Sequence, residues 1–188
     1  YPGGPQIEKT ASLCTDRQSA RDAFPLPRPL IDKAKSAENA CDFSFSGVKT
    51  SVRLHIERGE GGFDNKSKVM LSASLEETIA EILQNRSSNA MKRFIECYED
   101  KPRAFVVSGG VAANSTIRTA LHKTCARYDF DFYAPPLELC GDNAAMIAWV
   151  ACERLKQGGK GDLLDSPARP RWPLDPDAPA RQGAGVKA

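Results

Sequence analysis

The sequence predicts an α/β fold in which helices alternate with parallel strands, on three observations. A long helical pattern of apolar residues covers about 69–98. Two short apolar runs that end in glycine or proline, at 104–108 and 129–136, predict strands. Helical patterns then follow each of these strands, at about 115–127 and 143–157. Strands separated by single helices are typical of a parallel sheet.

Composition places the chain among ordinary globular proteins. Its 188 residues are 41% hydrophobic and 27% charged, enough for about one domain with a core. The net charge of +2 lacks the basic excess that by itself indicates a nucleic-acid partner. The six cysteines are scattered without a C-x-x-C pair, so we expect free thiols in a reducing cytoplasm. We find no run of 18 apolar residues and expect no membrane span. Because the first residue is Tyr1 and not Met, we expect a fragment of a longer protein.

Residues 1–67 are predicted to be irregular. Proline at every second position within 25–29 opposes regular helix. Phe43 and Phe45 alternate with serines before a glycine, which predicts a short strand entering a turn. The "YPGGP" segment at 1–5, taken by itself, predicts a surface turn.

Residues 68–164 are predicted to form an α/β lobe, and 165–188 a tail rich in proline, arginine and alanine. The polar stretch 84–89 is expected to bend or interrupt the long helix. One face of that helix is predicted to be apolar and to pack into the core, and it carries Leu75, Ile79, Ile82 and Leu83.

The first strand turns into a helix through Ser108-Gly109-Gly110. Successive backbone N–H groups at such a turn form an anion-binding concavity, and the helix dipole adds positive potential. Gly109 and Gly110 would let a ligand reach the backbone without meeting a Cβ atom. Asn114 carries an amide that suits a ribose hydroxyl or a phosphate. The plainer interpretation, a tight turn with Asn114 as an ordinary helix cap, is favoured by the pattern alone.

Asp142 follows the second strand at the start of the last helix. Spacing alone favours a helix cap, although a carboxylate there can also hold a metal or ligand hydroxyls. The carboxyl ends of parallel strands lie at one edge of a sheet, so the two loops are expected to share a ligand site. His55 and His122 belong to no metal-binding pair, and His122 is predicted on a helix surface. The residues therefore predict a nucleotide-like ligand at the sheet edge.

Several longer motifs add a resemblance to a known family. In order they are "YPGGP", "LPRPL", "DFSFSGVKT", "VVSGGVAAN", "ELCGDNAAMIAW" and "RPRWPL". Together they closely resemble the bacterial tRNA N6-adenosine threonylcarbamoyltransferases, formerly called O-sialoglycoprotein endopeptidases, over residues 1–174. The resemblance implies an actin-like, sugar kinase-like ATPase fold. This chain would be its C-terminal ribonuclease H-like lobe, with an inserted helical segment.

The resemblance implies an acyl transfer. The threonylcarbamoyl group of threonylcarbamoyl-adenylate would go to N6 of adenosine 37 in tRNAs that read ANN codons. It further implies one divalent metal, Fe(II), and three partners: tRNA, a paralogous actin-like protein and a P-loop ATPase. A non-catalytic, actin-like scaffold of the same complex is the alternative. A metallopeptidase has less support, because the sequence contains no H-E-x-x-H helix.

On the family pattern, Asp142 matches the metal-ligand aspartate and Asn114 matches the asparagine that binds the adenylate. Gly4 matches a substrate-contacting glycine, and Gly109 and Gly110 would line the nucleotide cleft through their backbone. These matches favour a ligand role over a cap for Asp142, and they favour the enzyme over the scaffold.

The chain also departs from the family pattern. The metal-binding histidines and the first phosphate loop of the family's N-terminal half are missing here. Gly141 stands where many relatives have threonine. No general base can be assigned, so the catalytic residue remains unknown. The chain is expected to hold half of a site and to be inactive alone.

Overall fold

The computed structural model describes residues 3–31, 40–59, 63–167 and 177. The chain divides into two compact units, Tyr1–Asn143 and Ala144–Ala188. Within the first unit lie five helices, two short 3₁₀ turns and two strands among the described residues. These strands position the candidate site.

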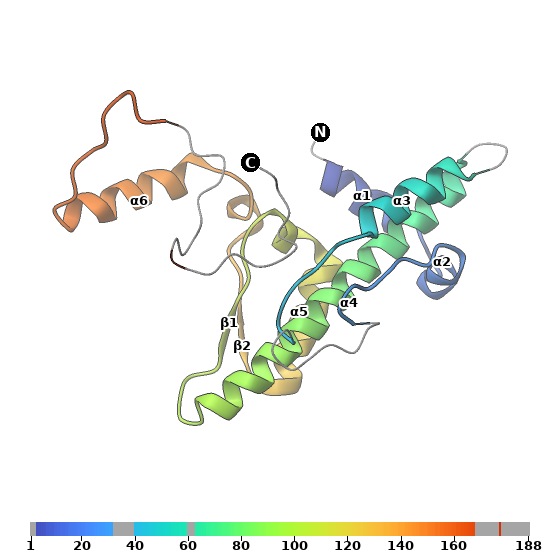
Figure 1. The fold of residues 1–188 in the computed structure, drawn as a ribbon, viewed down its shortest axis with the longest axis horizontal. Helices are drawn as coiled ribbons and strands as arrows, with labels where there is room; N and C mark the ends of the chain where they lie inside the picture. The colour runs from blue at the N-terminus through green and yellow to red at the C-terminus, as the bar shows by residue number, and fades with distance from the viewer. Residues whose placement is uncertain (1–2, 32–39, 60–62, 168–176, 178–188) are drawn as a thin grey trace. The chain divides into compact units, whose positions relative to one another are not determined.

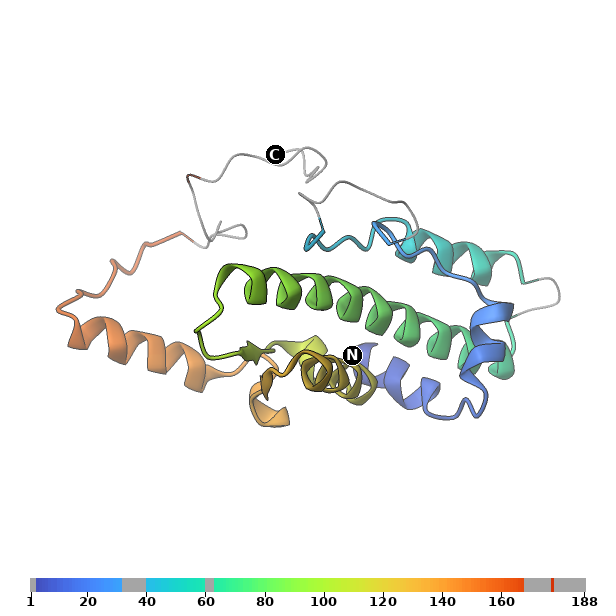
Figure 2. The same ribbon diagram turned by 90° about the horizontal axis from the view of Figure 1, so that it is seen from below.

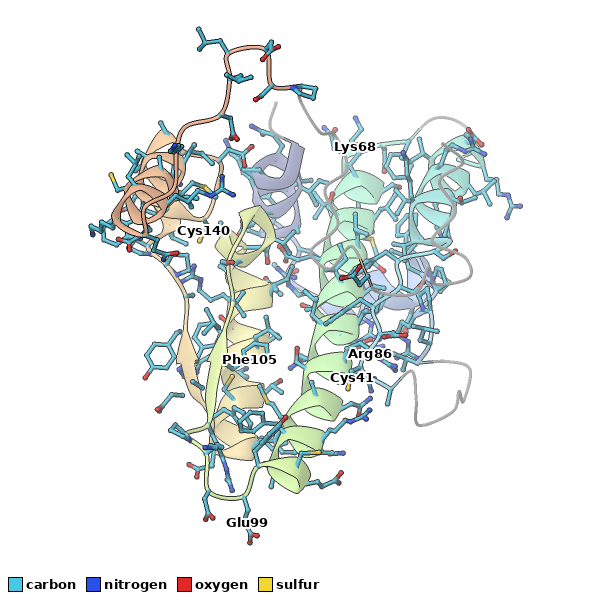
Figure 3. All side chains as sticks on the ribbon, turned by 60° about the vertical axis from the view of Figure 1, so that its left-hand side comes forward. Cys41, Lys68, Arg86, Glu99, Phe105 and Cys140 are labelled. Atoms are coloured by element: carbon cyan, nitrogen blue, oxygen red, sulfur yellow. The ribbon has the colours of Figure 1, made fainter. Side chains whose placement is uncertain are left out.

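Helix α4 (Asn65–Cys97) is the spine of the first unit (Figure 1). It begins at Asp64, whose side chain accepts a hydrogen bond from the Ser67 amide at 2.7 Å. The expected interruption within 84–89 is wrong, because the helix runs through this stretch without a break. Its polar side chains bond to other parts of the protein: Arg86 donates to the Leu30 and Ala40 carbonyls at 2.9 and 3.0 Å. Arg86 and Cys41 lie on the same side of α4 in Figure 3.

The N-terminal part is helical where we expected irregular chain. Helices α1 (Gly3–Ala11) and α2 (Arg17–Ala23) pack against α4 through small side chains. The prolines within 25–29 lie outside the helices, as expected. The surface turn predicted for the segment 1–5 is wrong, because Gly3, Gly4 and Pro5 form the first turn of α1, where a proline loses no intrahelical hydrogen bond. The alanines of this contact are fully buried, and they are Ala11, Ala20 and Ala73.

Helix α3 (Val48–Glu57) begins just after the residues where the Phe43 and Phe45 alternation predicted a strand, and that prediction is wrong. Both phenylalanines are exposed, and the described residues form no strand there. Gly47, with φ of +83°, precedes the helix in a left-handed conformation that glycine accommodates easily. Figure 2 shows α3 on one side of α4, with α1 and α5 on the other.

Strands β1 (Ala104–Val106) and β2 (Asp131–Tyr133) pair in parallel, with Phe105 opposite Phe132. Helix α5 (Ser115–Tyr128) connects them and packs on α4. The predicted strand–helix–strand order is confirmed, although both strands are shorter than the predicted runs. Apolar side chains from α4, α5 and the strands form the core between these elements, including Ala80, Met91, Phe105, Ile117, Leu121, Cys125, Phe130 and Phe132.

The second unit contains helix α6 (Ala144–Lys156), close to the predicted range. Gly158, with φ of +78°, lies just beyond its end, as expected for a C-terminal glycine. The helix begins one residue later than expected, so Asn143 and not Asp142 precedes it. From 168 on, only residue 177 of the predicted tail lies within the described residues.

All six cysteines are free thiols, and burial raises the pKa of Cys125. None of the helices in the described ranges is long and apolar enough to cross a membrane.

Candidate functional site

Two loops leave the parallel strands at the same edge, as predicted. The first follows β1 and spans 107–114, and the second follows β2 and spans 134–143. The Val107 amide donates to the Tyr133 carbonyl at 2.9 Å, which holds the two loops together where they begin. In Figure 3, Phe105 marks β1 and Cys140 marks the second loop.

The glycines of the first loop lead into a 3₁₀ turn, η2 (Gly110–Ala113), before α5 starts. Gly109 has φ of +90° and ψ of 169°, a conformation essentially confined to glycine. A Cβ atom built on Gly109 or Gly110 meets nothing within 4 Å, so both face open space. The connection between β1 and α5 is therefore one 3₁₀ turn longer than the direct strand-to-helix turn that the sequence predicted. The backbone of both glycines is accessible, as a cleft lining requires.

Asn114 caps α5, as predicted. Its Oδ1 accepts a hydrogen bond from the Ile117 amide at 2.9 Å. Its Nδ2 donates to Oε1 of Glu76 at 2.7 Å, which fixes the orientation of the amide group. A primary amide has two donor hydrogens and two acceptor lone pairs, so these contacts use half of its capacity. Asn114 can therefore cap the helix and bind a ligand hydroxyl at once.

Glu76 is the buried carboxylate behind Asn114, with 3% of its side chain exposed. Its Oε2 accepts from Arg17 Nη1 at 2.6 Å and from Thr116 Oγ1 at 2.8 Å. Burial lowers the pKa of Arg17, but the hydrogen bond and charge of Glu76, with a contribution from Glu77, outweigh it and raise that pKa. Glu76 was not among the residues predicted from the sequence. The signal was a carboxylate beside the predicted apolar face of a long helix, a place where charged side chains need partners.

Glu8 of α1 reaches the start of α5. Its Oε1 accepts from the Ser115 amide at 2.8 Å and from the Ser115 hydroxyl at 2.6 Å. Gly4 lies one turn before Glu8 on the same face of α1. A carboxylate of the protein thus already meets the positive end of α5. The arrangement favours a neutral ligand group, such as a ribose, near Asn114 over a phosphate on the first amide of α5.

Arg118 of α5 ties the two loops to each other. Its Nε donates to the Ala112 carbonyl at 2.9 Å. Its Nη2 lies 3.2 Å from the Pro135 carbonyl and 3.3 Å from Sγ of Cys140, which is buried. One guanidinium therefore sets the spacing between the loop of Asn114 and the loop of Asp142.

Asp142 lies exposed in the second loop. Among the described residues, no three histidine, cysteine, aspartate or glutamate side chains are grouped to hold a metal ion. His55 contacts the Pro25 carbonyl at 3.2 Å, and His122 is exposed and packs on a phenylalanine, as a surface histidine should. A transition metal needs about three protein ligands. The described part of the chain therefore does not form a metal centre by itself.

Comparison with known proteins identifies the family of the chain that carries this sheet edge. The family model for "tRNA N6-adenosine threonylcarbamoyltransferase" matches residues 1–149. The chain belongs to this family. Relatives with that name include those of Rhodospirillum rubrum, at 46% identity, and Sphingopyxis alaskensis, at 45%, each aligned with 100% of this chain. The Rhizobium meliloti relative is 43% identical over 98% of the chain.

The chain spans about half the length of these transferases, since it covers 48–49% of each. This agrees with the expectation that it represents part of a longer protein. The matched region includes both loops of the sheet edge and every site residue that the sequence predicted, namely Gly4, Gly109, Gly110, Asn114 and Asp142.

Gly109 and Gly110 are expected to respond differently to alanine. Gly109→Ala should destabilise the protein by about 1–3 kcal/mol, because its backbone conformation excludes a Cβ atom. Gly110→Ala should leave stability nearly unchanged, since its φ is not positive and its Cβ meets open space. If a ligand approaches the backbone here, Gly110→Ala should still weaken adenylate binding. Thermal unfolding and calorimetric titration of both variants measure this, and equal unfolding temperatures for the two would contradict it.

Proposed function

We propose that this chain supplies one half of the site that transfers a threonylcarbamoyl group from threonylcarbamoyl-adenylate to N6 of adenosine 37 in tRNAs reading ANN codons. The observation that carries the proposal is the Asn114 amide. It is fixed by buried Glu76 beside two open glycines, inside the region that the family model matches. The names of the relatives support the tRNA and the acyl group.

The reaction joins the adenosine N6 nitrogen to the carbamoyl carbon. The C–O bond between that carbon and a phosphate oxygen of the adenylate breaks, AMP leaves with the bonding electrons, and the attacking amine releases a proton to solvent. Because AMP is a good leaving group, the protein mainly has to hold the two substrates in register. Asn114 would bind a ribose hydroxyl of the adenylate, while Gly4, Gly109 and Gly110 would allow its close approach. No residue of this chain is assigned the proton.

Asp142 would contribute one carboxylate to an Fe(II) ion whose remaining ligands come from the half of the protein that this chain does not span. We derive no step through the metal, because the described residues do not form its site. The complete protein would act in the cytoplasm with a paralogous actin-like partner and a P-loop ATPase. On this proposal the 188-residue chain is inactive alone.

The test uses a full-length hybrid, in which the half that this chain does not span comes from the Rhodospirillum rubrum relative. We would titrate a non-hydrolysable adenylate analogue with and without Fe(II). Asn114→Ala should weaken binding about tenfold or more, which corresponds to the loss of a good hydrogen bond. Asp142→Ala should abolish any enhancement by Fe(II) without changing the unfolding temperature, because the side chain is exposed.

Glu138→Ala is the matched control, since it removes an exposed carboxylate from the same loop. It should leave binding and its metal dependence unchanged. Metal-independent binding that survives Asp142→Ala, together with no transfer to tRNA by the hybrid, would favour the scaffold instead. Transfer by the isolated chain would contradict its inactivity.

Gly4→Ala should raise stability while lowering function. Gly4 is the second residue of α1, where alanine is favoured over glycine by less than the value of about 0.5–1 kcal/mol in a helix interior, and no neighbour lies within 4 Å of an added Cβ atom. If Gly4 contacts the substrate, the same methyl group should weaken adenylate binding. Unfolding and titration of the hybrid measure the two effects, and a stabilised variant with unchanged binding would remove Gly4 from the site.

A further inference from the structure

A second polar groove lies at the other end of α5 from Asn114. It has a volume of about 510 Å³ and is bounded by α4, the last turns of α5 and the turn at 28–31. Four cationic side chains line it, and they are Arg28, Lys92, Lys123 and Arg127. We call this the α4–α5 groove.

The groove carries an excess of positive charge. Glu81 supplies the one carboxylate among the described residues that line it. That carboxylate is already paired, with Arg21 at 2.5 Å and with Arg28 at 3.3 Å. Lys123 and Arg127 are exposed, one turn apart on α5. The groove therefore presents exposed cations to solvent and favours a polyanion.

The remaining lining fits nucleic acid better than a simple anion. Tyr128 lies beside the cations, with Lys92 Nζ 5.9 Å from its ring centroid. Asn85 and Ser88 add hydrogen-bonding side chains along the same face of α4. Cations for phosphates, polar groups for sugar hydroxyls and an aromatic ring are the chemistry with which proteins hold RNA.

The distance from the candidate site suits a contact on the same RNA. Arg127 lies thirteen residues after Asn114 along α5. At 1.5 Å per residue this separation is about 20 Å, roughly the axial rise of six base pairs of a double helix. A structured RNA that presents one base beside Asn114 is long enough to cover the groove as well.

We propose that the α4–α5 groove binds the phosphate backbone of the tRNA substrate at a contact remote from the modified base. The identity of the RNA rests on the proposed function, whereas the groove and its charge do not. Such contacts position the RNA and add affinity that depends on salt, without reading its sequence.

The experiment measures tRNA binding by the hybrid across a salt series. The double variant Lys123→Gln/Arg127→Gln should lower the slope of log K against log salt by about 1–2 and weaken binding about tenfold at low salt. Adenylate binding should not change. The control Lys49→Gln/Arg53→Gln removes the same charge from the exposed face of α3 and should leave the slope unchanged. The proposal would be overturned if the slopes of log K against log salt were equal for the unsubstituted hybrid and the groove variant. It would also be overturned if the hybrid did not bind tRNA.

Two further measurements separate this inference from a free-nucleotide site and from the proposed reaction. If the groove is a site for a free nucleotide, the groove variant will lose ATP binding that tRNA does not compete for, and the proposal fails. If the hybrid binds tRNA with a slope that depends on the groove but transfers no acyl group, the groove stands and the proposed reaction fails. Transfer with an unchanged slope rejects the groove alone.

Discussion

Glu76→Ala is expected to lower the free energy of unfolding by about 3 kcal/mol. The substitution removes a carboxylate that is only 3% exposed and that accepts hydrogen bonds from three side chains. Breaking a buried ion pair by removing one partner costs about 3–5 kcal/mol, and buried donors left without an acceptor cost more. Arg17 keeps a second contact, with Glu77 at 3.0 Å, which places the expected loss at the lower end. Chemical denaturation of the variant measures it.

Two matched variants separate charge from shape. Glu76→Gln keeps the volume but places an N–H group where Asn114 or Thr116 also donates, so about 1–2 kcal/mol should be lost. Glu77→Gln removes the more exposed partner of Arg17 and should cost less than about 1 kcal/mol. If Glu76→Ala is no worse than Glu77→Gln, the carboxylate does not stabilise the fold. Adenylate binding should fall in Glu76→Ala, since this variant removes the acceptor that orients the Asn114 amide.

The sequence predicted the elements whose apolar pattern is strong. The long periodicity of α4, the two apolar runs and the Asn114 cap each depend on local chemistry, and the structure has all three. Helices α1 and α2 were missed because their buried side chains are alanines, which add little to hydrophobic periodicity. Gly47 was correctly read as a break in the chain, but the break starts a helix and does not end a strand.

The candidate site was only partly predictable for a related reason. Spacing placed Gly109, Gly110 and Asn114 at one strand end, because all three lie within six residues. The partners of Asn114 and of the helix it caps come from far away in the sequence. Glu8 is separated from Ser115 by 107 residues, and such pairs have no local pattern. The metal site that we propose for the complete protein is the extreme case, because the proposal assigns a ligand role to one residue of this chain, Asp142.

Arg118→Ala is expected to lower transfer by the hybrid about 10²-fold. The guanidinium holds carbonyls of both loops, so its loss lets the Asn114 loop and the Asp142 loop move independently. A misplacement of about 1 Å between reacting groups can cost this much in rate. Arg118→Lys should not restore the activity, because a single ammonium lacks the planar fork that reaches both loops. Steady-state kinetics with tRNA and adenylate measure both variants.

A purely structural role for Arg118 makes a different prediction. In that case Arg118→Ala would lower kcat/KM only in proportion to the fraction of unfolded protein, and cooling or added osmolyte would restore kcat/KM. A positioning role predicts that folded Arg118→Ala still binds the adenylate analogue at Asn114 but loses its enhancement by Fe(II), since the two loops are no longer in register. Thr119→Ala, a substitution at the exposed neighbouring residue of α5, should change neither quantity. Retained Fe(II) enhancement in Arg118→Ala would show that the loops keep their spacing without the guanidinium.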